Sequence, residues 1–125
     1  MKYLCLICAE TVMEHMTEAA AADHYREYAE FTNDIKHNGH FVSANRLKPV
    51  DTAVTVRVRN GQVSVTDGPF AETKEQFGGY YVIEARDLNE AIQVAAKIPG
   101  ARYGSVEIRP IADDAQTQTL GFDVP

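Results

Sequence analysis

The alternation of hydrophobic and polar positions is most regular over residues 54–67, where it predicts a β-hairpin. The runs VTVRVR and QVSVTD are joined by Asn60-Gly61, a residue pair that favours a two-residue type I′ turn. With this turn the valines pair across the strands and share one face. These are Val56, Val58, Val63 and Val65, and the other face carries Thr55, Arg57, Arg59, Gln62, Ser64 and Thr66.

Four further apolar runs predict strands, at residues 3–9, 41–46, 77–85 and 105–109. The first, YLCLICA, is apolar without interruption, which predicts a central strand that is covered on both faces. In the last, Val106 and Ile108 alternate with Glu107 and Arg109, so one face is apolar and the other is charged.

Two amphipathic segments predict helices. The first spans residues 18–38, ends at Gly39, and carries an apolar stripe at helical spacing: His24, Tyr28, Phe31 and Ile35. The second begins with a capping box in which Asp87 is the cap and Glu90 its reciprocal partner, and it stops before Pro99-Gly100. Its inward side chains are expected to be Leu88, Ala91, Ile92 and Ala95.

The resulting order is β-α-β, a hairpin, and β-α-β, which predicts an α+β fold: a ferredoxin-like sandwich with an antiparallel sheet and an inserted hairpin. Both helices then cover one sheet face, and the uncovered face calls for a homodimer. The interface is expected on the hairpin face carrying Thr55, Arg57, Ser64 and Thr66 or, failing that, on the valine face. One domain is expected over residues 1–110, followed by an extended or disordered tail over 111–125.

Composition narrows the classes of function. A net charge of −6, with no two Lys or Arg residues adjacent, disfavours nucleic-acid binding. The 45% hydrophobic and 24% charged content are those of an ordinary globular protein. The longest apolar run is far too short to span a membrane, and we expect a cytoplasmic protein without metal or cofactor.

Cys5 and Cys8 form a C-x-x-C spacing, but they lie on a predicted strand and not at a helix N-terminus. Residues i and i+3 of a strand point to opposite faces, and no second pair completes a zinc site. We therefore expect two reduced, structural cysteines.

The stretch TDGPFAETKEQFGGYY, residues 66–81, contains candidate site residues. Asp67 has two interpretations: its carboxylate accepts backbone N–H groups in the turn while Phe70 fills a core pocket, or it acts as a general base at a cleft. In the second interpretation Phe70 forms a wall and Lys74 contacts an anion. Tyr80, on the following strand, is a further candidate ligand contact.

His24 and Tyr28 lie on the helix stripe, where they are core aromatics or, alternatively, proton-transfer groups. Glu107 and Arg109 form either a surface ion pair or the wall of a dimer cleft beneath His24. The remaining histidines, His15, His37 and His40, lack the spacing of metal ligands.

The segment DGPFAETKEQFGGYYVIEARDLNEAIQVAAKIP, followed by GSVEIRP, resembles the DGPF branch of the YCII-related family. The resemblance covers residues 1–110. It implies a bacterial, dimeric ferredoxin-like α+β barrel with a cleft between helix and sheet at the dimer centre. Function in the family is mostly unknown, and some relatives occur beside or fused to extracytoplasmic-function sigma factors.

The parent group resembles muconolactone isomerase-like barrels and carries a His-Asp pair, which this chain replaces with Tyr28 and Ile98. Two functions therefore remain open. One is a small-molecule-binding or regulatory module, and the other is an isomerase- or lyase-type enzyme that transfers a proton in the cleft.

Overall fold

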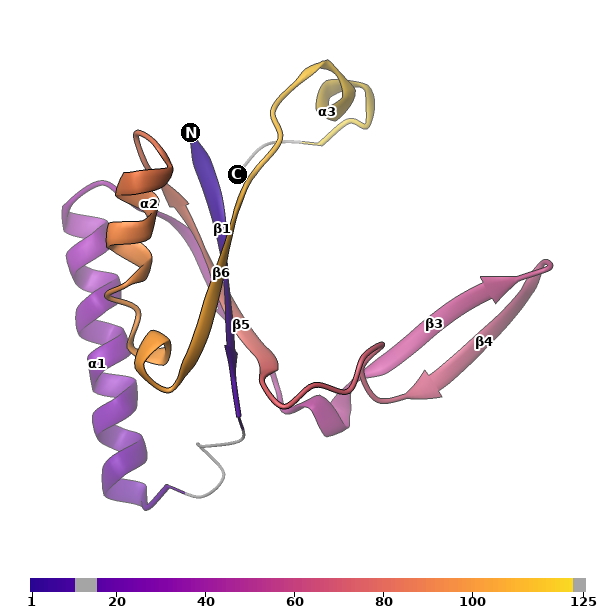
Figure 1. The fold of residues 1–125 in the computed structure, drawn as a ribbon, viewed down its shortest axis with the longest axis horizontal. Helices are drawn as coiled ribbons and strands as arrows, with labels where there is room; N and C mark the ends of the chain where they lie inside the picture. The colour runs from indigo at the N-terminus through magenta and orange to yellow at the C-terminus, as the bar shows by residue number, and fades with distance from the viewer. Residues whose placement is uncertain (11–15, 123–125) are drawn as a thin grey trace.

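A four-stranded antiparallel sheet forms the centre of the molecule in the computed structural model, which describes residues 1–10 and 16–122. Its strands, in spatial order, are β2 (Phe41–Arg46), β5 (Gln76–Glu84), β1 (Lys2–Ala9) and β6 (Gly104–Pro110). The predicted apolar strand β1 is thus central, paired with β5 on one side and β6 on the other (Figure 1).

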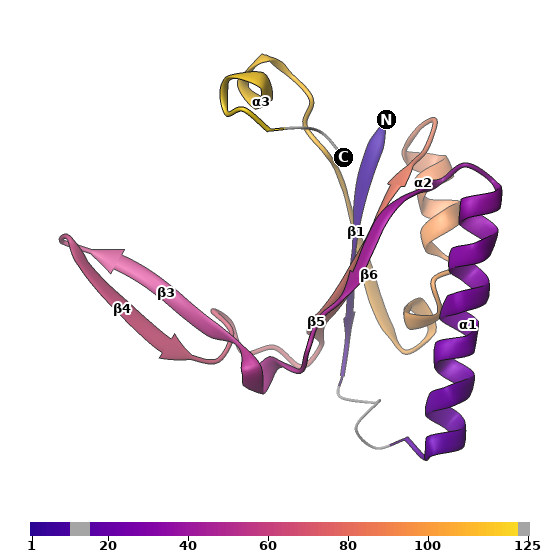
Figure 2. The same ribbon diagram turned by 180° about the vertical axis from the view of Figure 1, so that it is seen from behind.

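The helices α1 (Glu18–His37) and α2 (Leu88–Ala95) lie on one side of this sheet in both views (Figures 1 and 2). Thr17 caps α1 by accepting the N–H of Ala20 at 3.1 Å, and Asp87 caps α2 by accepting the N–H of Glu90 at 2.9 Å. The Glu90 carboxylate reaches back to the N–H of Arg86, one residue earlier than a reciprocal box requires. The predicted ferredoxin-like α+β fold is confirmed.

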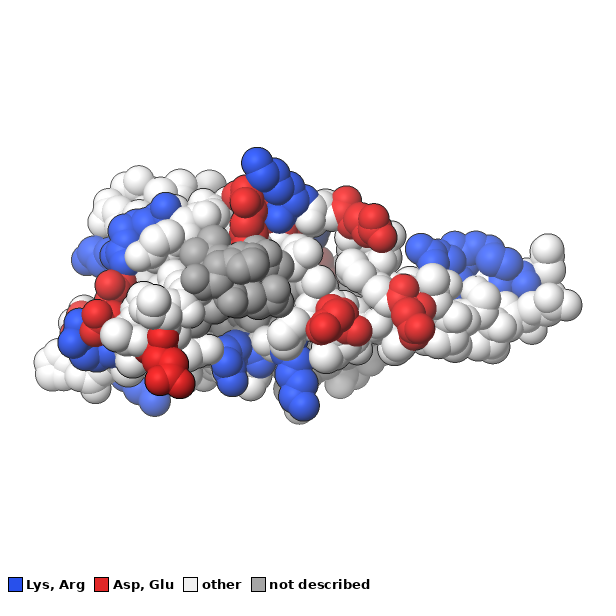
Figure 3. Space-filling model, turned by 90° about the horizontal axis from the view of Figure 1, so that it is seen from below, with Lys and Arg blue, Asp and Glu red and all other residues white. Residues whose placement is uncertain are grey.

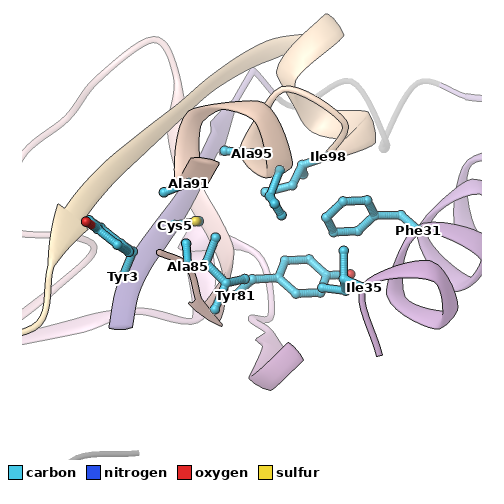
Figure 4. Close-up of a cluster of buried hydrophobic side chains, with 11 residues drawn as sticks. Tyr3, Cys5, Phe31, Ile35, Tyr81, Ala85, Ala91, Ala95 and Ile98 are labelled. Carbon is cyan, nitrogen blue, oxygen red and sulfur yellow. The ribbon is translucent and has the colours of Figure 1, made fainter. Parts of the chain in front are cut away.

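The hydrophobic core lies between the helices and the sheet (Figure 4). Phe31 and Ile35 of α1 pack here against Tyr81 of β5, and the Phe31 and Tyr81 rings meet edge to face with centroids 5.2 Å apart. The predicted stripe of α1 is therefore the face that it buries.

The inward face of α2 differs from the prediction. Ala91, Val94 and Ala95 are buried, whereas Leu88 and Ile92 are about half exposed. Because α2 has only two turns, the small residues set its close approach to the sheet, and the larger Leu88 and Ile92 remain at the margin.

Strand β1 is fully buried on one face and half buried on the other, which corrects the expectation of two fully covered faces. Tyr3 and Cys5 are buried beneath the helices, while Leu4 and Leu6 on the opposite face are half buried. Leu6 pairs with Glu107 on one side and Tyr80 on the other. We call this surface, made of Leu4, Leu6, Tyr80, Glu107 and Arg109, the open sheet face.

The hairpin has the predicted strands and register. Strands β3 (Val54–Arg59) and β4 (Gln62–Asp67) pair Val56 with Val65 and Val58 with Val63, and Asn60 and Gly61 have φ values of +52° and +74°. Within the described residues these strands pair only with each other, and the hairpin projects from the side of the sheet opposite the helices (Figure 1).

The structure also contains three short helical segments among the described residues. They are η2 (Val50–Thr52), η3 (Pro99–Arg102) and α3 (Ala115–Thr119). The expectation of an unstructured tail is wrong for α3, where Asp114 accepts the N–H of Thr117 at 3.2 Å and Thr117 is buried. Sequence periodicity missed α3 because five residues are too few to show a helical period.

Candidate functional site

A cavity of about 470 Å³ opens between the N-terminal half of α1 and the neighbouring ends of β1, β2 and β5. We call it the α1 cavity. Its lining is mainly aromatic and aliphatic, and the side chains that matter most here are His24, Tyr25, Tyr28, Phe77 and Tyr80. A concave, largely apolar site with a few polar groups is the usual form of a small-molecule site.

Two glycines at the start of β5 leave room for this cavity. Gly78 and Gly79 both line it, and Gly79 pairs with Arg46 of β2. A Cβ atom on Gly79 would lie 2.9 Å from the backbone oxygen of Asn45, so only glycine lets β2 approach this closely. The FGGYY sequence thus shapes the cavity from the strand side.

His24 is the main titratable side chain of the cavity. Its ring lies edge to face against Tyr28 and Tyr103, with centroids 5.0 and 5.3 Å away. Burial lowers the pKa of His24; the Glu27 carboxylate opposes this shift and the Arg102 guanidinium adds to it. The imidazole is therefore favoured in its neutral form.

The Nδ1 atom of His24 is buried without a hydrogen-bond partner among the described residues. Unpaired buried polar atoms are uncommon in folded proteins, because each one forfeits the hydrogen bonds that it makes with water. This unpaired atom belongs to a ring that lines the α1 cavity.

Tyr28 is fixed by a contact that crosses the fold. Its hydroxyl accepts the backbone N–H of Gly100 at 3.0 Å, which joins α1 to η3. Burial raises the pKa of Tyr28, and the N–H of Gly100 partly offsets this rise. The phenol is consequently a neutral, oriented wall of the cavity.

Arg46 and Glu10 are charged side chains that line the α1 cavity. Arg46 donates to the Tyr25 hydroxyl at 2.9 Å, and its guanidinium carbon lies 5.4 Å from the centre of the Tyr25 ring. Glu10 also lines the cavity and pairs with Lys74 at 3.3 Å. Both pairs are exposed, so their contribution to stability is small and their main effect is on the charge near the opening.

One wall of the cavity is also the stem of the hairpin. Residues 47–50 line the cavity, and the N–H of Leu47 donates to the Gly78 oxygen at 2.9 Å. The chain then passes through η2 directly into β3. The cavity and the hairpin therefore share a segment of backbone.

Three of the predicted site residues meet at this cavity: His24, Tyr28 and Tyr80. The Tyr80 hydroxyl accepts from the Asn45 amide at 2.9 Å, at the edge nearest the open sheet face. Lys74 reaches the rim only through Glu10.

The DGPF turn lies elsewhere. Asp67 ends β4, and its carboxylate makes no hydrogen bond within residues 1–10 and 16–122. The turn is closed by Gly68 instead: its N–H donates to the Ala53 oxygen at 2.7 Å, and its carbonyl oxygen accepts from the Thr55 hydroxyl at 2.8 Å. Phe70 is 83% exposed, so the expected anchoring of this ring in the core is wrong for the single chain.

Glu107 and Arg109 also lie outside the cavity. They project from the open sheet face, whereas His24 lies on the helix side of the sheet, so within one chain they do not contribute to the α1 cavity. The structure adds Tyr25, Arg46 and Phe77 instead. A prediction that the strand at residues 41–46 pairs with the strand at residues 77–85 would have placed Arg46 beside the FGGYY segment.

In residues 1–10 and 16–122 no group of three or more His, Cys, Asp or Glu side chains is placed to hold a metal ion. In the same ranges we find no helix with the length and apolarity needed to cross a membrane. His15 lies outside the described residues.

Comparison with known proteins gives three findings. The sequence model of the YCII-related domain matches residues 1–114. An uncharacterized protein of Rhizobium meliloti (strain 1021) is 46% identical over 69 residues, which are 54% of this chain and 56% of that protein. The matched part thus spans little more than half the length of this relative.

A solved structure shares the fold. It is 5-chloro-2-hydroxyhydroquinone dehydrochlorinase from Burkholderia phenoliruptrix AC1100, in complex with 2,5-dihydroxybenzoquinone. The TM-score is 0.53, and the match covers 93% of this chain and 98% of the other at 11% identity. At 11% sequence identity, this similarity shows that the two proteins share a fold.

Proposed function

This chain belongs to the YCII-related domain family, and on that basis we propose that it is a small-molecule-binding module whose ligand occupies the α1 cavity. The observation that carries the proposal is the aromatic lining of the cavity around His24, whose buried Nδ1 has no hydrogen-bond partner among the described residues. The cavity volume of about 470 Å³ suits a molecule of metabolite size.

The lining favours a flat ligand with oxygen substituents. Tyr25, Tyr28 and Phe77 offer ring surfaces for stacking, and the neutral His24 offers hydrogen bonding without a fixed charge. Arg46 at the rim favours an acidic or phenolic group facing the opening. A small oxygenated aromatic molecule satisfies all three features.

The solved structure of similar fold supports this choice of ligand class by its own ligand, 2,5-dihydroxybenzoquinone. The two proteins share the fold, and this chain supplies its own aromatic and polar groups to the cavity. We therefore use the quinone as a probe compound.

The test is a calorimetric titration of the purified protein with 2,5-dihydroxybenzoquinone and with 4-hydroxybenzoate, beside saturated cyclohexane-1,4-diol as a non-aromatic control. Binding by an aromatic probe is expected to weaken about tenfold in Phe77→Ala, the loss of one stacking contact. Phe70→Ala removes the same kind of ring at a more exposed position outside the cavity and should leave affinity unchanged. Equal weakening by both variants, or equal binding of the saturated diol, counts against the proposal.

A second candidate function is proton transfer on the bound molecule, as in an isomerase or lyase. It is favoured by the lowered pKa of His24, since a neutral imidazole is able to accept a proton near neutral pH. Incubating a bound probe that carries an exchangeable C–H bond in heavy water tests it by mass spectrometry. Deuterium uptake that disappears in His24→Gln supports catalysis, and uptake equal to the protein-free rate argues for binding alone.

The cellular setting that we propose is the bacterial cytoplasm. The relative identified above is bacterial, and both cysteines of this chain are free, which suits a reducing compartment. Cell fractionation followed by immunoblotting checks this location, and recovery in an envelope fraction would contradict it.

A further inference from the structure

A second cavity lies between α1 and the segment formed by α2 and η3. It measures about 370 Å³, and its buried lining residues are apolar, among them Phe31 and Ile35 of α1 and Val94 of α2. We call it the helix groove. Its lining and that of the α1 cavity have none of the described residues in common. A molecule in the helix groove therefore makes contacts of its own.

A contact between the two walls lies at each end of the helix groove. At one end the Arg102 guanidinium of η3 pairs with the Glu27 carboxylate of α1. At the other end the Nδ1 atom of His40 lies 3.9 Å from the carboxylate of Glu90, in the first turn of α2. Between these ends the wall is formed by residues 27–38, a length of about 16 Å along a helix. The groove is thus long enough for an extended small molecule.

The α1 wall of the groove carries a row of carboxylates. Glu27, Glu30 and Asp34 follow one another at spacings of three and four residues, so they share one side of the helix. Like charges at these spacings destabilise a helix unless cations lie nearby. Arg102 compensates Glu27, and the Nε atom of Arg26 lies 3.7 Å from the Glu30 carboxylate.

Asp34 is the carboxylate of this row that has no such cation. Among the described residues it forms no ion pair. It lies in the last turn of α1, where the helix dipole disfavours negative charge. Lys36 of the same turn lies instead over the Phe41 ring, with its Nζ atom 4.8 Å from the ring centre. A ligand ammonium group beside Asp34 relieves this unfavourable arrangement.

His40 adds a hydrogen-bond acceptor at the same end of the groove. Its Nδ1 atom lies 2.9 Å from the Glu84 carbonyl oxygen, which is able only to accept, so Nδ1 carries the proton of the neutral ring. The lone pair of the ring then lies on Nε2. Asn38, which also lines this end, offers a side-chain carbonyl oxygen. This end of the groove therefore suits an ammonium group.

The opposite wall supplies a positive charge. Lys97, which follows α2, is exposed, and no carboxylate of the described residues forms an ion pair with it. Figure 3 shows acidic and basic side chains close together over the helical side of the molecule, at the left. The Lys97 ammonium is thus free to bind a carboxylate of a ligand.

We propose that the helix groove binds a small zwitterion of the amino-acid class, with its ammonium group beside Asp34 and His40 and its carboxylate on Lys97. The aliphatic part of the ligand lies between these charges, against Phe31 and Val94. A molecule with only one of the two charges leaves either Asp34 or Lys97 without a partner, so it binds more weakly. This site is separate from the α1 cavity, and it does not depend on the function proposed for that cavity.

Proton–nitrogen correlation NMR of the full chain, titrated with 6-aminohexanoate, tests the proposal. The amide signals of residues 34–40 and 94–102 should shift in a saturable way, with a dissociation constant of about 1 mM or lower. Hexanoate and pentylamine each carry one of the two charges on a similar aliphatic chain. Both should bind about fivefold more weakly than 6-aminohexanoate, because each loses one ion pair.

Lys97→Gln and Asp34→Asn remove the two charges one at a time, and each should weaken the binding of 6-aminohexanoate about fivefold. Both side chains are exposed, so the variants are expected to fold. Lys36→Gln and Asp51→Asn are matched controls, because they remove the same kinds of charge at exposed positions outside the groove. They should leave the affinity unchanged.

The absence of saturable shifts overturns the proposal, as does equal affinity for 6-aminohexanoate and the two singly charged probes. Equal weakening by the groove variants and their matched controls also overturns it, because the effect then comes from the overall charge of the chain. The positions of the shifts give a readout that needs no variant. Saturable shifts confined to residues of the α1 cavity, such as His24 and Phe77, place the probe there and overturn the proposal as well.

Discussion

The Tyr28 hydroxyl accepts the backbone N–H of Gly100 at 3.0 Å and ties the middle of α1 to the turn before β6. Glycine is required at this point for steric reasons: a Cβ atom there would lie 2.5 Å from the Tyr28 oxygen and 2.8 Å from the Ile7 side chain. This contact positions one wall of the α1 cavity.

Gly100→Ala is therefore expected to lower the free energy of unfolding by roughly 1–3 kcal/mol, the usual cost of overpacking. Chemical denaturation followed by circular dichroism measures it. Gly78→Ala is the matched control, because a Cβ at Gly78 meets nothing within 4 Å. If the two alanines cost the same, the contact between Tyr28 and Gly100 does not constrain the fold.

Phe70→Ala should change the intrachain stability little, since the Phe70 ring is largely exposed. Phe31→Ala, in the core, should instead cost roughly 3–5 kcal/mol because it leaves a cavity beside Tyr81. Urea unfolding of both variants decides the matter. A large loss for Phe70→Ala would mean that this ring is covered in the assembled protein.

The lowered pKa of His24 predicts a pH dependence of stability. Below its ordinary pKa of about 6.5 the unfolded chain binds a proton at His24 that the folded chain does not. The free energy of unfolding should therefore decrease as the pH falls through this value toward the folded pKa. His24→Gln should reduce that slope, whereas His37→Gln, at the exposed end of α1, serves as the control; identical slopes in all three proteins would contradict the assignment.

Cys5 and Cys8 should react with thiol reagents at different rates. Burial raises the pKa of Cys5 to about 11. Burial also raises the pKa of Cys8, with further contributions from Glu107 and Glu75, but its side chain is only half buried. A disulfide reagent at pH 8 should label Cys8 first and Cys5 only on unfolding, with two free thiols in denaturant. Fewer than two thiols would show that the pair is oxidised or modified.

The hairpin was predictable because its information is local. Asn60-Gly61 sets the turn, and the alternating valines on either side then have one register. The stripe of α1 was predictable for the same reason, and it supplied His24 and Tyr28. In α2 the pattern failed, because burial there depends on how closely Ala91 and Ala95 let the helix approach the sheet.

The rest of the site depends on contacts between distant segments. Arg46 and Gly79 are 33 positions apart and become neighbours only when β2 pairs with β5. The DGPF stretch is the most distinctive motif of the sequence, yet its Asp67 and Phe70 lie at the base of the hairpin and not at the cavity. The motif that identifies the family is thus separate from the cavity in which we propose the ligand binds.

The segment 47–50 is both a wall of the α1 cavity and the stem of the hairpin, and it therefore connects two predicted equilibria: the proposed ligand binding and the homodimerisation expected from the sequence. A ligand that favours one position of this stem changes the free energy of chain association, and association then changes ligand affinity by the same factor. The dimer dissociation constant measured with and without a saturating ligand gives that factor directly. A value of one would mean that the stem is rigid and that the two surfaces act independently.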